Sequence, residues 1–283
     1  MGRAFCLVAG FAFIEAVGGY LSNSLTLLAD AGHMFLDASA LILSWYALRL
    51  ARRENDHRLS YGYHRFQVLA AFVNALALFV LVAWIAVEAI GRLRAPEPML
   101  PVSALTIASI GLLVNIVALR MLHGTDNLNV RSAALHVLGD LLGSVAAIGA
   151  ALAVLLFGFL YADPILALAI VVILAKGAWG ILRESGHILL EGVPGDIDLQ
   201  EIRDALTADV TDVREIHHLH AWALTSEKPL LTLHASVEDT QEVDDHDVVT
   251  RIKNVLIDRF GIDHSTIQVE RGPCPDDERG IGS

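Results

Sequence analysis

The sequence predicts an α-helical membrane protein in which six transmembrane helices are followed by a small α/β domain. Hydrophobic residues make up 54% of the 283 residues and charged residues only 18%, whereas about a quarter of the residues in a typical soluble domain are charged. The charge is divided unevenly, because residues 1–182 carry a net +1 and residues 183–283 a net −13. We expect four segments: a six-helix membrane domain (1–185), a linker (186–195), an α/β domain (196–272) and a flexible tail (273–283).

Six apolar runs are long enough, or nearly so, to cross a bilayer, which takes about 20 residues per helix. They cover residues 4–21, 25–50, 66–91, 101–122, 132–159 and 164–182. The first run is too long for the apolar part of a signal peptide, carries Glu15 in its interior and is followed by five further runs. We therefore expect it to be retained as the first transmembrane helix.

Basic residues flank the runs unequally, and such residues concentrate on the cytoplasmic side of a membrane protein. The other side has only Arg92 and Arg94. Nine others lie in the loops after the second and fourth runs and at the exit from the sixth: Arg49, Arg52, Arg53, Arg58, Arg65, Arg120, Arg131, Lys176 and Arg183. We therefore expect both termini, and with them the acidic domain, in the cytoplasm.

The part after residue 195 has the periodicity of a small α/β domain. Asp198 followed by Glu201 is typical of the start of a helix, and "VREIHHLHAWAL" and "PLLTLHASVE" alternate like the two strands of a hairpin. "DVVTRIKNVLIDRFG" is an amphipathic helix ended by Gly261, and "STIQVE" is a last strand. The order α-β-β-α-β, with both helices on one face, predicts a ferredoxin-like or metallochaperone-like fold.

Two of the apolar runs carry acids and histidines at helical spacing. In "LLADAGHMFLDAS" (27–39), Asp30, His33 and Asp37 lie on one helix face, where ionisable groups are costly in a membrane. "AALHVLGDLLGS" in the fifth run repeats the pair with His136 and Asp140. A single pair also fits an interhelical hydrogen bond. Two matching pairs instead supply four nitrogen and oxygen ligands, which suit tetrahedral Zn²⁺.

The chain resembles the cation diffusion facilitator family over nearly its whole length. The motifs that carry the resemblance are "SNSLTLLADAGHMFLD", "LNVRSAALHVLGDLLGS", "ADP", "LLEGVP", "HHLHAWALTS" and "HSTIQVE". The family implies a homodimeric exporter of divalent metal, driven by protons that move the other way. It implies a transport site at His33, Asp37, His136 and Asp140, and a histidine at the first position implies zinc. Ligands must lose protons to bind metal, so metal and protons compete for one site.

The resemblance also implies metal ligands outside the membrane. In the acidic domain it implies His217, His234, His264 and Glu270, with His246 as a further candidate. In the loop after the second run the match is partial and leaves two alternatives: an interfacial site at His64, or basic residues that simply bind the anionic lipid leaflet. His220 is interpreted as structural. The sequence leaves open whether the single Cys274 adds a thiolate, because the paired tail cysteines of the family are reduced to one.

Further polar residues within the runs have no ligand role in this interpretation. Asp30 lies one turn toward the non-cytoplasmic end of its helix, which favours a supporting or exit-path role over ligation. Glu15, Asn74 and Asn115 are single polar groups in other runs, for which interhelical hydrogen bonds are the expected explanation.

The function predicted from these features is efflux of a divalent cation, zinc first and cadmium or cobalt as further candidates, from the cytoplasm in exchange for protons. No phosphate-binding glycine loop indicates ATP-driven pumping, so we expect a carrier, not an enzyme, with no catalytic cofactor and no nucleic-acid partner. The expected location is the bacterial inner membrane. The alternative is a membrane metal sensor that signals through its acidic domain. Paired ligands inside the runs favour transport.

Overall fold

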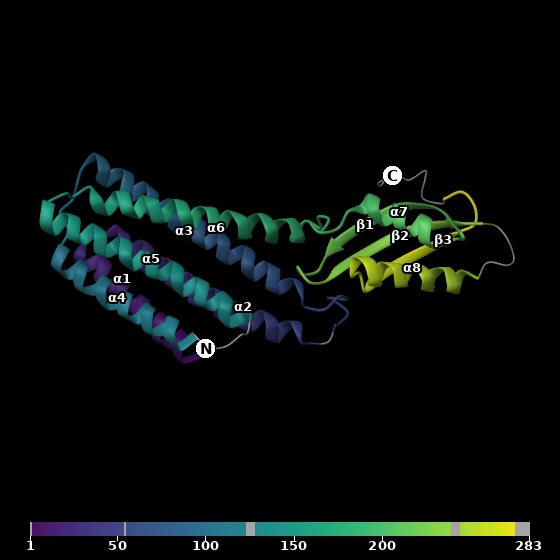
Figure 1. Cartoon of the computed structure of the whole chain (residues 1–283), viewed down its shortest axis with the longest axis horizontal. Coiled ribbons are helices and arrows are strands. Elements are labelled where there is room, and N and C mark those ends of the chain that lie inside the picture. Colours follow the sequence, from purple (N-terminus) through teal and green to yellow (C-terminus); the bar gives the residue numbers. More distant parts are fainter. Residues whose placement is uncertain (1, 54, 123–127, 239–243, 275–283) are drawn as a thin grey trace. The chain divides into compact units, whose positions relative to one another are not determined.

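The structure, a computed structural model, describes the backbone of residues 2–53, 55–122, 128–238 and 244–274, and the side chains of these residues except 2–8, 121–122 and 128–139. Long helices come first, followed by a small α/β domain (Figure 1). The long helices are α1 (Gly2–Ser22), α2 (Leu25–Ala51), α3 (Arg65–Arg94), α4 (Pro101–Leu122), α5 (Leu128–Phe157) and α6 (Ala162–Leu189). The chain divides into two compact units, residues 1–46 with 70–182 and residues 47–69 with 183–283.

The long helices coincide with the six apolar runs of the sequence. Within the described residues, α2 to α6 are each long and apolar enough to span a membrane, and α1 adds a helix of 21 residues. Large side chains such as Trp84, Val87 and Trp179 are more than half exposed on these helices, as expected of surfaces that face lipid. The chain is therefore an integral membrane protein. Helix α6 continues to Leu189, four residues into the expected linker.

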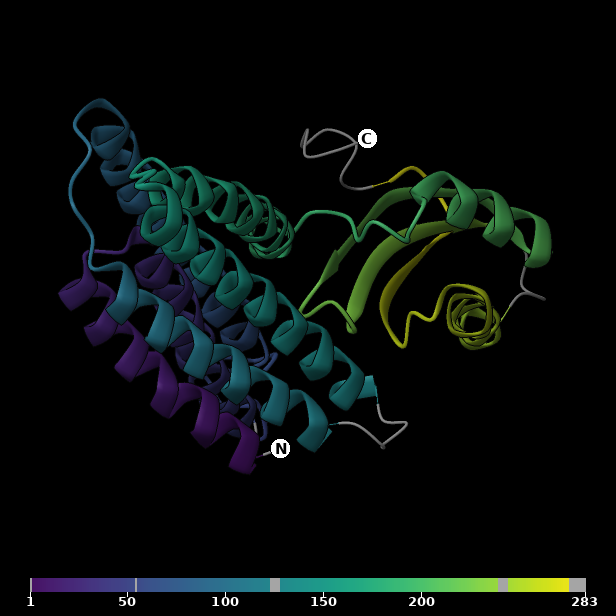
Figure 2. The same ribbon diagram turned by 60° about the vertical axis from the view of Figure 1, so that its left-hand side comes forward.

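Small residues line the contacts between the long helices. Helix α1 packs against α4, and α4 packs against α5 (Figure 2). The contact between α4, α5 and α2 buries mainly alanines and a leucine: Leu27, Ala104, Ala108, Ala147 and Ala151. A second apolar cluster joins α2 to α3 and α6. Small side chains let helix backbones approach closely where lipid provides no hydrophobic driving force.

The start of α2 is held by an acid from α6. Asp163 Oδ1 accepts hydrogen bonds from Ser24 Oγ (2.7 Å) and the Thr26 amide (3.2 Å), and Oδ2 accepts one from the Leu25 amide (2.7 Å). The first amides of a helix have no partner within the helix. Asp163 supplies that partner from a distant part of the sequence and so fixes where α2 begins.

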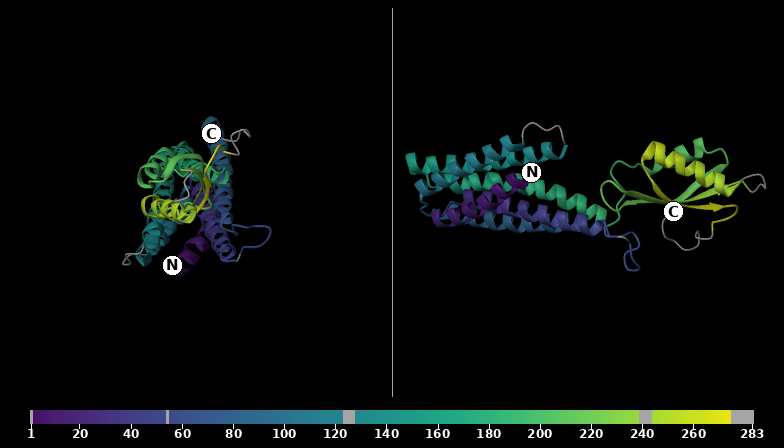
Figure 3. Two further views of the ribbon diagram at one scale, coloured as in Figure 1. Left: turned by 90° about the vertical axis from the view of Figure 1, so that its right-hand side faces the viewer. Right: turned by 90° about the horizontal axis from the view of Figure 1, so that it is seen from below.

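The C-terminal domain has the predicted order. Its elements are α7 (Leu199–Asp209), β1 (Val213–Ala223), β2 (Pro229–Val237), α8 (Asp245–Phe260) and β3 (His264–Glu270). The sheet order is β1-β2-β3, with β1 antiparallel and β3 parallel to β2. Both helices cover one face of the sheet (Figure 3). Leu231, Leu233 and Ala235 face these helices in the core, so the residues between them point to the opposite face.

The predicted helix ends of this domain are confirmed. The Asp198 carboxylate accepts hydrogen bonds from the Gln200 and Glu201 amides at the start of α7. Helix α8 ends at Gly261, whose φ of 65° is the left-handed conformation that glycine adopts without strain.

Candidate metal sites

Three ligands of the predicted membrane site converge between α2 and α5. His33 and Asp37 are one helical turn apart, with His33 Nδ1 3.2 Å from Asp37 Oδ2. Asp140 comes from α5, and one ligand atom from each of the three residues lies within 4.8 Å of the other two. Ligand atoms around a tetrahedral zinc at 2.0–2.2 Å lie roughly 3.3–3.6 Å apart, so the three ligand atoms are close enough together to belong to one site.

The fourth expected ligand, His136, lies one turn before Asp140 on α5. Its side chain is outside the described part of the chain. The burial of the other three differs: His33 and Asp37 are about one-fifth exposed, whereas Asp140 is 1% exposed. Among these three ligands, the α5 carboxylate is therefore the most deeply buried.

The acidic and amide groups near this site are buried. Asp30 is 2% exposed, and any Cβ at Gly143 of α5 would collide with its carboxylate. Asn115 donates a hydrogen bond from Nδ2 to Ser144 Oγ (3.2 Å), which confirms the expected interhelical bond. Glu15 differs from expectation, because neither of its carboxylate oxygens has a hydrogen-bond partner among the described residues.

A second ligand cluster lies on the helix-free face of the C-terminal sheet. His217 of β1 pairs in register with His234 of β2, and Glu270 ends β3. His217 Nε2 is 2.9 Å from Glu270 Oε2, and His234 Nδ1 is 3.0 Å from Glu270 Oε1. Cys274 Sγ is 3.6 Å from His234 Nδ1. Ligand atoms of all four residues lie within 4.8 Å of one another. Two imidazoles, a carboxylate and a thiolate are ligands that zinc accepts.

The charge of Glu270 is favoured by its surroundings. Burial opposes ionisation and is the largest single influence, but hydrogen bonds with Gln268 and Cys274 and the nearby His217 and His234 together outweigh it. The pKa of Glu270 therefore lies below its usual value. An ionised carboxylate is the form that binds metal, so the folded domain prepares this ligand.

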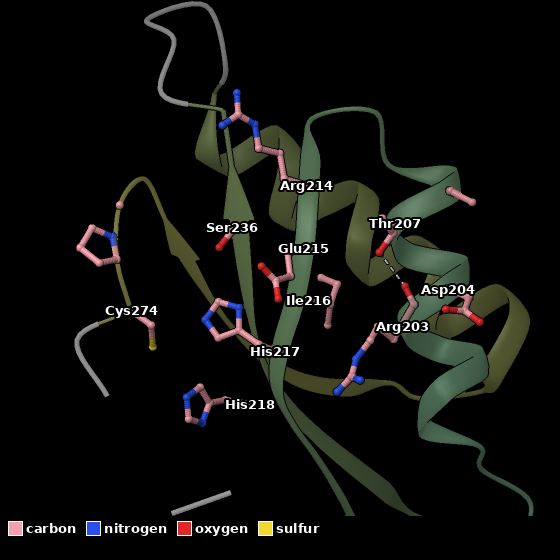
Figure 4. Close-up of a pocket in the computed structure, with 13 residues that line it drawn as sticks. Arg203, Asp204, Thr207, Arg214, Glu215, Ile216, His217, His218, Ser236 and Cys274 are labelled. Carbon is pink, nitrogen blue, oxygen red and sulfur yellow. Dashed lines mark hydrogen bonds between the residues drawn. The ribbon is translucent and has the colours of Figure 1, made fainter. Parts of the chain in front are cut away.

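One residue that the sequence did not assign, His218, also lies at this cluster. His218 sits at an irregularity between His217 and His220 and has a φ of 45°. At this irregularity, the centroid of the His218 ring lies 4.9 Å from the centroid of the His234 ring. A pocket along the edge of β1 is lined by His217, His218 and Cys274 (Figure 4). The adjacent histidines "HH" were a possible signal, but strict alternation placed His218 on the other face.

Three predicted ligands lie apart from this cluster. His264 shares a face with Glu270, but it opens β3 and pairs with Leu230, six residues and so about 20 Å away along the strand. The ring of His264 contacts that of Tyr61 instead, with centroids 6.0 Å apart. The structure therefore does not support His264 as a ligand together with Glu270 in one protomer. His246 is exposed at the start of α8, where its amide donates to Asp244.

His64 lies in the loop before α3, with Nε2 3.3 Å from Lys228 Nζ. Partial burial and the positive charge of Lys228 keep the pKa of His64 below its usual value. Within the described residues, His64 belongs to neither of the two groups of three or more potential ligands. A neighbouring ammonium group also disfavours a second cation there.

Comparison with known proteins gives matches over both units. The family described as "Cation efflux transmembrane domain" matches residues 2–190, and that described as "Cation efflux protein, cytoplasmic domain" matches residues 194–272. Zinc transporter ZitB of Escherichia coli (strain K12) is 46% identical over 275 residues, 96% of this chain and 87% of ZitB. The "Cadmium, cobalt and zinc/H(+)-K(+) antiporter" of Bacillus subtilis (strain 168) is 39% identical over 272 residues, 94% of this chain and 87% of the antiporter.

A solved structure, titled "Metal-bound C-terminal domain of the CzcD transporter from Cuprividus metallidurans", is 39% identical to this chain. The match covers 26% of this chain and 99% of the chain in that structure, with a TM-score of 0.24.

Proposed function

Because the chain belongs to the cation efflux family, we propose that it exports zinc from the cytoplasm in exchange for protons, and that His33, Asp37, His136 and Asp140 bind the zinc in transit. This is the cation diffusion facilitator family that the sequence motifs resemble. The observation that carries the proposal is the convergence of His33, Asp37 and Asp140 from α2 and α5. Relatives named for zinc transport and for exchange of metal against H⁺ support the ion and the driving force.

The exchange follows from the chemistry of the ligands. Zinc binds neutral imidazole nitrogen and ionised carboxylate oxygen, so each ligand must release any proton it holds before the metal binds. On the side with more protons, the same groups take up protons and release zinc. Histidine is suited to this competition because it titrates near neutral pH. Rocking of the helices around the site exposes it to one side at a time.

Zinc flux into proteoliposomes under an imposed pH gradient tests this proposal. We expect flux to require the gradient, and Asp140→Asn to abolish it without changing the amount of protein inserted, because the substitution removes the buried anionic ligand. Glu184→Gln, which neutralises an exposed acid of α6, is the control and should transport normally. Normal flux by Asp140→Asn would refute the assignment. Cadmium and cobalt flux in the same vesicles defines the selectivity.

We further propose that the C-terminal domain binds regulatory zinc through His217, His234, Glu270 and Cys274. This domain is strongly acidic, with a net −13 over residues 183–283, so two domains in a dimer repel each other at low salt. Bound zinc offsets part of the charge and draws the domains together, which biases the transport equilibrium. Zinc should then raise the melting temperature of the domain. His234→Ala with Glu270→Ala should remove this response but leave slow basal transport.

The assembly and orientation are proposed as a homodimer in the bacterial inner membrane, with both termini in the cytoplasm. The concentration of arginines after α2 and the match of residues 194–272 to a cytoplasmic domain support this orientation. Reporter fusions at residue 283 and in the α3–α4 loop should give opposite signals. Light scattering of the detergent-solubilised protein should give the mass of two chains after subtraction of detergent. A monomer at working concentrations would contradict the dimer.

A further inference from the structure

A row of buried polar groups extends from the transport residues toward α1. Its members come from four helices and are each at most 2% exposed: Asp140 and Ser144 on α5, Asp30 on α2, Asn115 on α4 and Glu15 on α1. Ser144 hydrogen-bonds both Asn115 and Asp30. The Glu15 carboxylate lies against Gly111 of α4, where a Cβ would come within 3.5 Å of Oε1.

The unsatisfied atoms of this row are all hydrogen-bond acceptors. Among the described residues, both oxygens of Glu15, Oδ2 of Asp30 and Oδ1 of Asn115 have no partner. The charged groups that act on these two acids are carboxylates: Asp140 acts on Glu15, and Glu15 and Asp140 act on Asp30. Helix α4, which packs against α1, has no titratable side chain before Arg120 at its end. These four acceptor atoms therefore have no donor directed at them within the described part of the chain, although Asn115 and Ser144 donate hydrogen bonds to other members of the row.

A proton supplies what this arrangement lacks. An ionised carboxylate that is buried without a partner is very costly, and nearby carboxylates cannot all carry charge at once. Glu15 is the clearest case, because it is fully buried and shares no hydrogen bond with the three transport residues among the described side chains. In the metal-free protein it is therefore a neutral carboxylic acid.

We propose that Glu15 is an additional proton carrier of the exchange, a role that rests on the proposed antiport function. When a divalent cation binds at His33, Asp37 and Asp140, its positive charge offsets the repulsion from Asp140. The O–H bond of the Glu15 carboxyl group then breaks, and the proton leaves to the water on the side from which the metal entered. When the metal departs on the other side, Glu15 takes up a proton from that side. One further proton thus crosses for each metal ion.

The test is the number of protons released when zinc binds to the full-length protein in detergent. Zinc is titrated into weakly buffered wild-type protein, Glu15→Gln and the control Glu184→Gln, with a pH-indicator dye to count protons and a competing chelator to measure affinity. Glutamine keeps the size of the side chain but holds no titratable proton. We expect Glu15→Gln to bind zinc and to release about one proton fewer per zinc than the wild type and the control. Equal proton release would overturn the inference.

A measurement on the wild type keeps the inference testable if Glu15→Gln does not fold. Infrared difference spectra should show that zinc removes the carbonyl band of a protonated carboxylic acid, and a spectrum without this loss overturns the inference. Wild-type flux separates the two proposals. If zinc flux does not respond to a pH gradient, the antiport function itself fails. If it does respond but Glu15→Gln releases as many protons as the wild type, only the role of Glu15 fails.

Discussion

Replacing Asp163 by alanine should destabilise the membrane domain and disorganise the start of α2. The carboxylate is 2% exposed and accepts three hydrogen bonds, from the Ser24 hydroxyl and the Leu25 and Thr26 amides. Alanine leaves these three donors buried without their acceptor. An unsatisfied buried donor costs about 1–3 kcal/mol, and loss of a helix cap alone costs about 0.5–2 kcal/mol. Allowing for partial relaxation, we expect a loss of about 3–5 kcal/mol in the free energy of unfolding.

Asparagine at the same position distinguishes the hydrogen bonds from side-chain volume. Its amide keeps one acceptor oxygen but turns an NH₂ group toward a donor, so Asp163→Asn should lose about 1–3 kcal/mol, less than alanine. The matched control is Asp198→Ala, which removes the exposed cap of α7 and should cost about 1 kcal/mol in the C-terminal domain only. His33 and Asp37 lie two to three turns beyond the capped end of α2, so zinc affinity at the transport site should fall with stability.

The assay is unfolding of the purified full-length protein by a denaturing detergent, followed by circular dichroism, with zinc binding measured in parallel. Side-chain hydrogen bonds between membrane helices contribute only about 0.6 kcal/mol on average. A loss below about 1 kcal/mol for Asp163→Ala would place Asp163 among these ordinary contacts. That result would refute the conclusion that it determines where α2 begins.

Three further predictions concern individual ligands and their surroundings. His33→Asp should raise the ratio of cadmium to zinc flux, because an added carboxylate replaces the nitrogen ligand; an unchanged ratio means that His33 does not set selectivity. The pKa of Glu270 is lowered in the folded protein, so its contribution to stability is full above the ordinary carboxyl pKa and is lost as the pH falls through the lower folded value. Glu270→Gln should therefore make the loss of stability at acid pH less steep. A loss as steep as that of the wild type would contradict this prediction. Lys228→Met should raise the pKa of His64 in an NMR titration, because it removes a neighbouring positive charge; an unchanged value would rule out Lys228 as a cause.

The parts of the fold that depend on local sequence were predictable. An apolar run of about 20 residues forms a helix in lipid because a helix is the only structure in which a single segment satisfies all of its own backbone hydrogen bonds. The spacing of His33 and Asp37 fixes their shared face once α2 is a helix, and the same holds for the caps at Asp198 and Gly261. The convergence of α2 with α5 was inferred from matching motifs and from family resemblance, not from spacing within either helix.

The parts that depend on distant contacts were not predictable. A helix that is apolar on all sides carries no pattern that shows which face meets its neighbours, so the fully buried position of Glu15 appears only in the structure. The same is true of Asp163, which lies in the first turn of α6 and caps the start of α2. His218 joins the C-terminal cluster through a local irregularity with positive φ, which alternation does not foresee. The distance of His264 from Glu270, in contrast, follows from strand rise alone.

The scaffolds of the two proposed metal sites favour different metal exchange rates. The C-terminal ligands His217, His234 and Glu270 stand on adjacent strands whose hydrogen-bonded register fixes their separation, so metal bound there is held by a rigid frame. The proposed membrane ligands stand on α2 and α5, which meet in an apolar cluster that includes Leu27 of α2 and Ala147 and Ala151 of α5. Such a contact can shift without breaking a backbone ladder, so movement of α2 against α5 separates Asp140 from His33 and Asp37. A site that must release its ion in each cycle requires this second kind of scaffold, whereas a site that senses zinc does not.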